Sequence, residues 1–192
     1  MFPATVKSIA AGAQRLRRLP AWGKLLRHED GTAAIEFAVV AAPFLALLFA
    51  ILESAFIFLA GQTLETATMG SSRLILTGQA QNQGYSMSSF QQSVCQSLAS
   101  FFNCSSVLVD VRTATNFCSA NTSLPLQNGQ VQNNFTYSPG NPGDIVVVRL
   151  MYQWPTYVSL LGLSTALSNM SGNNNLVMAT AAFRNEPYQS TP

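Results

Sequence analysis

The chain has 192 residues, of which 48% are hydrophobic and only 9% charged, and its formal net charge is +2. This length allows one domain with a core plus an appended segment, and so little charge disfavours disorder and favours secretion or membrane attachment. Most basic residues precede Gly31, whereas residues 32–192 carry four arginines against six carboxylates. A nucleic-acid-binding domain would keep its basic patch on the folded part, so we expect no nucleic-acid partner.

An apolar run without charge occupies residues 37–52 and resumes at 54–60 after Glu53. As a helix the first part covers about 24 Å, slightly less than a bilayer core, so the membrane span must include Glu36 or Glu53 near an interface. The basic segment before it keeps the N-terminus in the cytoplasm by the positive-inside rule. A soluble core helix is rarely so uniformly apolar, and a cleaved secretory signal would need a cut site of small residues that the end of the run lacks.

The start of the run places Glu36 fifth after Gly31, and a carboxylate at membrane depth costs at least a few kcal/mol. The segment resembles the processing site of type IV prepilins, in which a basic leader ends in glycine before an apolar helix with glutamate fifth. The resemblance implies that a prepilin peptidase cuts between Gly31 and Thr32. It also implies that Glu36 of one subunit attracts the new amine of Thr32 in a neighbour. An interfacial Glu36 without a partner is the alternative.

The stretches around this site, "GTAAIEFAVVAAPFLALLFAILE" and "LETATMGSSRLILTGQAQ", with "MATAAFRNEPY" near the C-terminus, are similar to the TadE-like family. Its members are minor pilins or pseudopilins of the tight-adherence, type IVc, pilus apparatus. Major pilins of that apparatus are very short and typically carry tyrosine after the glutamate, whereas Phe37 follows here and a domain over 81–192 comes afterwards.

The resemblance therefore implies a low-copy assembly subunit. Its expected partners are the prepilin peptidase, other pilins and pseudopilins of the same apparatus, and inner-membrane lipid. Its expected location is the bacterial inner membrane, crossed once, with the N-terminus cytoplasmic and the C-terminal domain periplasmic, or a surface pilus into which it is incorporated.

Helical periodicity continues beyond the membrane and predicts one long helix over residues 32–79, with its transmembrane part at about 33–60. Gly78 and Gly84 are expected to end this helix, and Pro43 to bend it. We expect a basic leader over residues 1–31 and, after it, a helical segment over residues 32–80 that includes the end of the long helix.

The apolar pattern after residue 80 predicts one more helix and several strands. Within "SMSSFQQSVCQSLASFFNC" a helix capped by Ser88 or Ser89 would carry one apolar stripe, formed by Phe90, Val94, Leu98 and Phe101. Alternating or continuous apolar patterns predict strands at 105–113, 144–154 and 174–186, with one weak strand near 131–137. Residues 155–167 are expected to form a short helix or an apolar segment rich in turns.

This order indicates a pilin-like α+β fold. We expect a long N-terminal transmembrane and amphipathic helix, packed on a small antiparallel sheet of three or four strands, with a second shorter helix.

All three cysteines follow the apolar run, where export permits oxidation. Bridges between Cys95 and Cys104 and between Cys104 and Cys118 are both allowed, and spacing alone does not decide the connectivity. The first spacing looks like a cysteine pair common among the family's members, and that resemblance favours Cys95 with Cys104. Cys118 would then be free or paired with another chain.

Residues for catalysis or metal binding are scarce. The only histidine, His28, precedes the proposed cut, and the cysteines lack zinc-site spacing. Four carboxylates are isolated in the sequence and are expected to be surface or strand-edge charges: Glu65, Asp110, Asp144 and Glu186. We therefore expect no enzyme activity, metal or cofactor. The competing functional hypotheses are an uncut, signal-anchored periplasmic binding module and, more remotely, a membrane-tethered hydrolase.

Overall fold

The computed structural model describes residues 32–98, 100–156 and 168–189. The expected leader, residues 1–31, and most of the segment expected at 155–167 lie outside these described residues. The chain divides into two units, Met1–Leu45 and Ala46–Pro192, and the packing described below belongs to the second unit.

The long helix α2 spans Thr32–Leu76 and contains Pro43 within its length. It ends close to the predicted position because Gly78 adopts a left-handed backbone conformation, with φ 76°. A Cβ at this position would lie 2.2 Å from the ring of Tyr188. The short helix α3, Gln79–Asn82, follows at once. Glycine is therefore required at this turn both by backbone conformation and by packing.

The second predicted helix is α4, Met87–Ser97. Its N-cap is Ser86, which accepts a hydrogen bond from the N–H of Ser89, so the prediction of Ser88 or Ser89 as the cap is wrong. The N-terminal half of the predicted stripe is confirmed, because Phe90 and Val94 are fully buried. The stripe does not continue to Phe101, which lies beyond the helix and is 47% exposed.

Three antiparallel strands form the main sheet in the order β1-β4-β5. They are β1, Val107–Ala114; β4, Ile145–Pro155; and β5, Asn174–Arg184. All three were predicted from apolar patterning. The weak strand predicted near 131–137 is not part of this sheet.

Instead, the loop between β1 and β4 contains a separate two-stranded hairpin, β2 (Leu126–Gln127) and β3 (Gln130–Val131). Farther along the same loop, Tyr137 makes one bridge to Val111 of β1. Short polar segments of this kind have too few apolar residues to form a full strand of the sheet.

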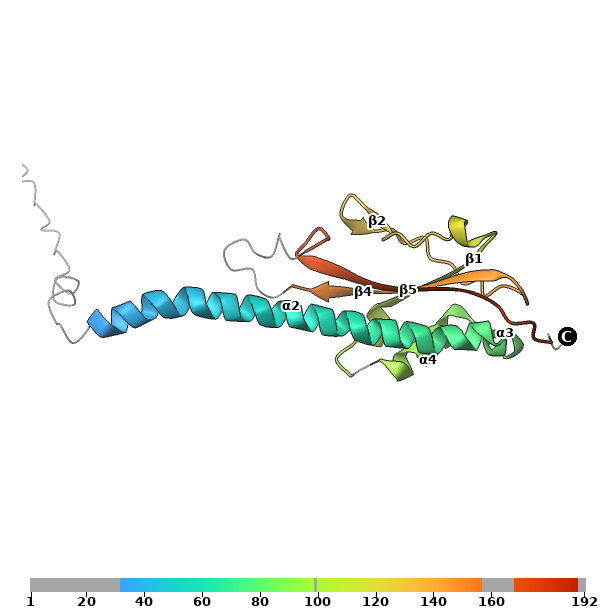
Figure 1. The fold of residues 1–192 in the computed structure, drawn as a ribbon, viewed down its shortest axis with the longest axis horizontal. Helices are drawn as coiled ribbons and strands as arrows, with labels where there is room; N and C mark the ends of the chain where they lie inside the picture. The colour runs from blue at the N-terminus through green and yellow to red at the C-terminus, as the bar shows by residue number, and fades with distance from the viewer. Residues whose placement is uncertain (1–31, 99, 157–167, 190–192) are drawn as a thin grey trace, which may run out of the picture. The chain divides into compact units, whose positions relative to one another are not determined.

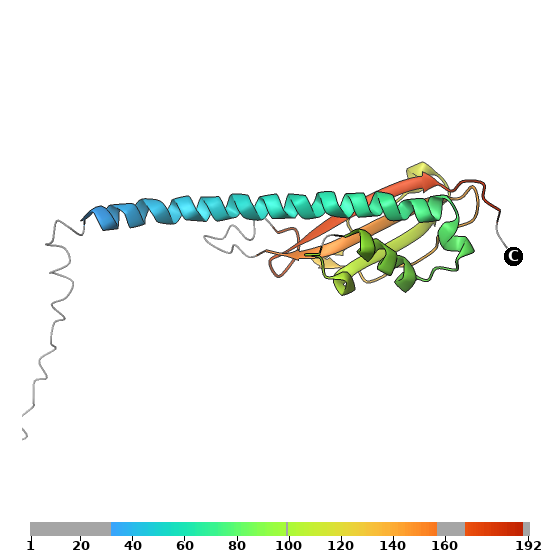
Figure 2. The same ribbon diagram turned by 90° about the horizontal axis from the view of Figure 1, so that it is seen from below.

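Side chains from α2, α4 and one face of the sheet form the core (Figure 1). From residue 60 onward α2 contributes two small and two large apolar residues to this core: Ala60, Leu64, Ala67 and Ile75. Figure 2 shows the same stretch of α2 lying along the sheet. The loop between β1 and β4 lies over the opposite face, where Val147 and Met151 are also buried. The sheet is thus covered on both faces.

Candidate functional site

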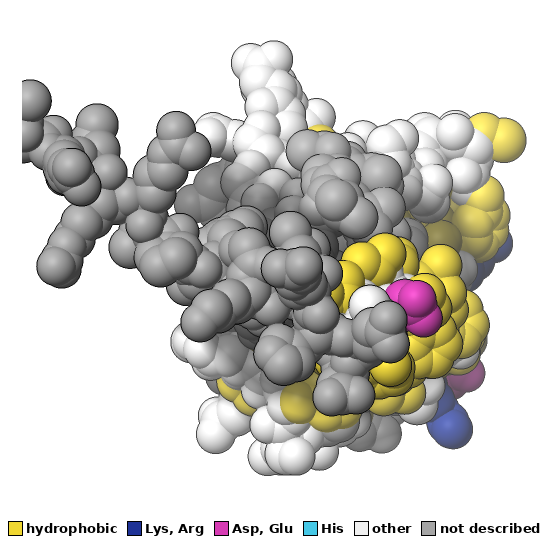
Figure 3. All heavy atoms as spheres, turned by 90° about the vertical axis from the view of Figure 1, so that its left-hand side faces the viewer, with side chains coloured by type: hydrophobic (Ala, Val, Ile, Leu, Met, Phe, Trp, Pro, Cys, Tyr) yellow, Lys and Arg dark blue, Asp and Glu magenta, His cyan; other side chains and the backbone are white. Residues whose placement is uncertain are grey.

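The first part of α2 consists largely of hydrophobic residues, and it exposes many of their large side chains. Exposed residues include Phe37, Val40, Phe44, Leu47, Ile51, Phe56 and Phe58. Figure 3 shows hydrophobic side chains gathered around this end of the helix. Such a surface is unfavourable in water and needs lipid or protein around it.

Length and composition qualify α2 as a membrane span, with a mean hydropathy of 2.5 over its most apolar window. It is the one helix of this kind among the described residues. The chain therefore has one N-terminal helix that can anchor it in a membrane by a single pass.

Glu36 is exposed in the second turn of α2 and is the only charged residue between Thr32 and Leu52. Glu36 follows Thr32, the first described residue of the helix, by four positions, so the two lie one turn apart on the same helical face. Gly31, the residue expected before the cut, lies outside the described residues. The described residues begin at Thr32, the residue that the predicted cleavage would make the N-terminus.

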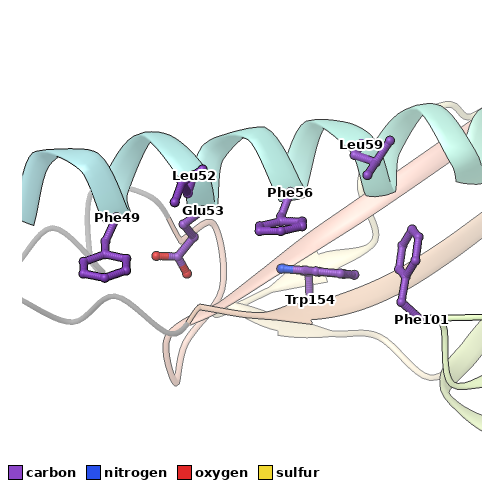
Figure 4. A pocket seen from close by; sticks show the side chains of 7 residues that line it. All are labelled: Phe49, Leu52, Glu53, Phe56, Leu59, Phe101 and Trp154. Carbon is purple, nitrogen blue, oxygen red and sulfur yellow. The ribbon is translucent and has the colours of Figure 1, made fainter. Parts of the chain in front are cut away.

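A second carboxylate in the apolar run behaves differently. Glu53 is only 6% exposed, and it points from α2 into an apolar groove of about 540 Å³ (Figure 4). The groove is also lined by Phe49, Phe56 and, across from α2, by Trp154 of β4. The length of the apolar run predicted that Glu36 or Glu53 lies near a membrane interface, whereas this groove was not predicted.

Aromatic rings form one wall of the groove and tie it to the sheet. Phe102 packs edge-on against Tyr152 at a ring-centroid distance of 4.9 Å, and Trp154 lies 6.1 Å from the rings of Phe101 and Phe102. Such tilted and edge-on pairs stabilise one another beyond the area they bury. The wall is therefore held by contacts within the domain.

A buried charged centre lies on the opposite face of the sheet. The Asp110 carboxylate is fully buried and forms salt bridges with Arg149 and Arg112, which lies on the same strand. It also accepts a hydrogen bond from the N–H of Thr136, at 2.9 Å. The prediction that Asp110 is a surface or strand-edge charge is therefore wrong.

The pKa of Asp110 follows from these contacts. Burial raises the pKa of the carboxyl, but the hydrogen bond from Thr136, those from Arg149 and Arg112, and the charge of Arg149 together lower it below its ordinary value. The carboxylate is therefore ionised at neutral pH. With two guanidinium groups around one carboxylate, the centre has a net positive charge.

The two arginines also fasten the long loop to the sheet. Arg149 donates to the carbonyl of Ser123, and Arg112 donates to the carbonyl of Asn134. One buried carboxylate thus positions two side chains, each of which holds a different part of the loop. Sequence reasoning missed this centre. Its signal was the pair Asp110 and Arg112 on alternate positions of β1, facing Arg149 in an apolar strand.

Cys95 of α4 and Cys104 are joined by a disulfide, with Cα atoms 5.6 Å apart. This is the pairing that the resemblance favoured. The bridge ties α4 to the short 3-10 helix η2, Cys104–Ser106, which leads into β1. Cys118 is exposed and carries a free thiol.

Within the described residues, no group of three or more His, Cys, Asp or Glu side chains is placed to hold a metal ion. Among the remaining predicted surface charges, Glu65 and Glu186 are exposed, and Asp144 accepts a hydrogen bond from the N–H of Asn141 at 2.8 Å.

Comparison with known proteins gives one positive result. No curated protein and no solved structure matches the chain. Residues 31–73 match a family model described as TadE-like protein. The match covers the position of the expected cut, the exposed apolar part of α2 and much of its packed part, but not the C-terminal stretch 178–188. Over residues 31–73 the resemblance to the TadE-like family is thus confirmed, and it indicates a component associated with the tight-adherence pilus.

Proposed function

We propose that this chain is a minor pilin or pseudopilin, a structural assembly component of a bacterial tight-adherence pilus. In this proposal a prepilin peptidase removes residues 1–31, α2 anchors the mature chain in the inner membrane with its N-terminus cytoplasmic, and the packed domain lies in the periplasm. Its partners are the peptidase, other pilins and pseudopilins, and membrane lipid. It needs no catalytic residue, metal or cofactor.

The observation that carries the proposal is the position of Glu36. The exposed apolar stretch begins at Thr32, and Glu36 is its only charge before Glu53. Uncompensated, such a carboxylate is costly in lipid, and an amine created at Thr32 by cleavage is the partner that would offset it. Because Thr32 and Glu36 of one chain are a single turn apart, the same surface presents an amine and a carboxylate to a neighbouring helix.

The test measures processing and assembly separately. Mass spectrometry of the natively expressed, membrane-extracted protein should find a mature N-terminus at Thr32. Gly31→Ala, or loss of the prepilin peptidase, should leave the leader attached. An intact leader on the unmodified protein would refute the proposal and favour the uncut, signal-anchored binding module.

The role of Glu36 is tested by Glu36→Gln, which keeps the shape but removes the charge. It should leave processing intact and abolish the incorporation or assembly activity of the subunit. Glu186→Gln is the control, because Glu186 is an exposed glutamate of the packed domain outside α2. Equal assembly by the two variants would contradict the proposed role of Glu36.

A further inference from the structure

The outer edge of β5 carries backbone groups that face away from the sheet. Asn169 shows which ones, because its side chain accepts from the N–H of Leu176 at 2.7 Å and donates to the carbonyl of Leu176 at 3.1 Å. Both backbone groups of Leu176 therefore point away from β4. Pairing between β4 and β5 continues without a bulge, so Met178, Thr180 and Ala182 face the same way.

These three positions differ from Leu176 in having no such cover. Among the described residues, no hydrogen bond reaches the outward N–H or C=O groups of Met178, Thr180 or Ala182. The opposite edge of the sheet is treated differently, since Val111 of β1 donates to the carbonyl of Thr136 and accepts from the N–H of Ser138. The edge of β5 is thus open along a short window.

A groove runs beside this window between β5 and α2. Two adjoining hollows of about 290 and 420 Å³ are lined by both elements and share Glu65 and Thr180. Ser72 lines the first hollow, is 5% exposed, and its hydroxyl has no hydrogen-bond partner among the described residues. An extended backbone lying here would meet the open edge and this hydroxyl together.

Features that normally protect a sheet edge are missing from β5. Native edges are usually blocked by lysine, proline, a bulge or an inward-pointing charge. From Asn174 to Phe183 the strand has no charged residue and no proline, and its pairing is regular. An open, regular and neutral edge is the surface to which an added strand binds through main-chain hydrogen bonds.

We propose that the edge of β5 at Met178–Ala182 binds an extended strand of a different protein chain, antiparallel to β5. Antiparallel pairing is the more stable arrangement per residue. Charge indicates the order of residues in that strand, because Glu65 and Arg73, both exposed, line the groove in chain order. An antiparallel partner would place an acidic residue near Arg73 at its start and a basic residue near Glu65 at its end.

A second copy of this chain is the less suitable occupant. Position 61 of α2 is next to Val177 and the carbonyl of Leu76 accepts from the N–H of Glu186, so α2 and β5 run in the same direction. Antiparallel pairing of two β5 edges would therefore point two α2 helices in opposite directions. Copies anchored in one membrane with one orientation, as the proposed function requires, cannot adopt that arrangement.

Amide hydrogen exchange on the full chain in detergent micelles tests this directly. The probe is a synthetic peptide with blocked ends, EVTVTVK, added in excess. We expect the outward amides of Met178, Thr180 and Ala182 to exchange rapidly without peptide and at least about tenfold more slowly with it. The inward amides of Val177 and Ala179, bonded to β4, serve as the internal control. The reversed peptide KVTVTVE should protect less, and EVTPTVK, which lacks the central donor, should not protect.

The matched variants act on one backbone group. Thr180→Pro removes the outward N–H without touching a hydrogen bond to β4 and should abolish protection, whereas Thr180→Val retains the N–H and should behave as the unmodified chain. Ala182→Pro repeats the test if Thr180→Pro fails to fold.

Strand addition would be refuted if neither EVTVTVK nor KVTVTVE protected the outward amides, or if EVTPTVK protected them as well as EVTVTVK does. Protection that appears without peptide and rises with protein concentration would overturn the choice of a different chain. None of these results depends on leader cleavage, which the mass of the N-terminus reports separately.

Discussion

The two parts of α2 differ in composition and have opposite surroundings. Up to Leu59 its large apolar side chains are mostly exposed, whereas from Ala60 onward the helix buries Leu64 and Ile75 against the sheet. The difference in surroundings follows from the polar residues in the second part of the helix. Beyond residue 60 polar and small residues alternate with apolar ones, so one face can meet a protein core and the other can meet water.

Hydroxyl groups in the packed part show how that core tolerates polar residues. Thr68 and Ser71 are buried, yet each donates to a carbonyl four residues earlier in the helix, at 2.7 Å. Their hydrogen-bonding needs are thus met without a partner from the sheet. The first part of α2 needs an environment supplied from outside the chain, and the second part brings its own.

The largest change in unfolding free energy is expected for a substitution at the buried charged centre of the packed domain. Asp110→Ala would leave Arg149 buried without its counter-charge and release both anchors of the loop. We expect a loss of about 3–5 kcal/mol in the free energy of unfolding, measured by chemical denaturation in detergent. Glu65→Ala, an exposed carboxylate on α2, is the control and should change it by less than about 0.5 kcal/mol. Similar losses in both variants would contradict a structural role of the buried centre.

Two leucines of α2 test the contrast within the helix itself. Leu64→Ala creates a cavity in the core and should cost about 2–5 kcal/mol of unfolding free energy. Leu47→Ala, the same change at a residue that is 62% exposed, should cost less than about 0.5 kcal/mol in micelles. Urea unfolding followed by tryptophan fluorescence would measure both. Comparable destabilisation by the two changes would show that Leu47 also packs within the domain.

A smaller effect is expected from acid. The folded-state pKa of Asp110 lies below its ordinary value of 3.8, so its contribution to stability is present above that value and is lost as the pH falls through the folded-state pKa. Unfolding midpoints measured from about pH 6 to about pH 2 should therefore fall more steeply for the unmodified chain than for Asp110→Asn. Parallel slopes would mean that Asp110 does not titrate as described, whatever the absolute stability of the variant.

Much of the fold followed from periodicity. The long helix and the three main strands were predicted because each has a sustained apolar pattern, and Gly78 marked the end of α2 correctly. The cap of α4 was missed because three serines stand within four residues, and only the backbone decides that Ser86 accepts the bond from Ser89. The hairpin β2–β3 lacks an apolar pattern and depends on turn geometry, with Asn128 and Gly129 both at positive φ.

The sites divide in the same way. Glu36 could be found from sequence because its signal is local: a charge at a fixed distance from a glycine at the start of an apolar run. Asp110 could not, because its burial depends on Arg149, which is remote in sequence, and on a loop that closes over both. The groove beside Glu53 likewise depends on Trp154 of β4, which is remote from α2 in the sequence.

The parallel course of α2 and β5 has a mechanical consequence. Tension along the packed part of α2 acts parallel to the strand beside it, so that the contact between the helix and the sheet is loaded in shear. The hydrogen bond from Glu186 to Leu76 lies at the far end of that contact, and Gly78 turns the chain back directly behind it. Tension along this part of α2 is thus resisted by the helix–sheet contact, which includes the core side chains Leu64 and Ile75.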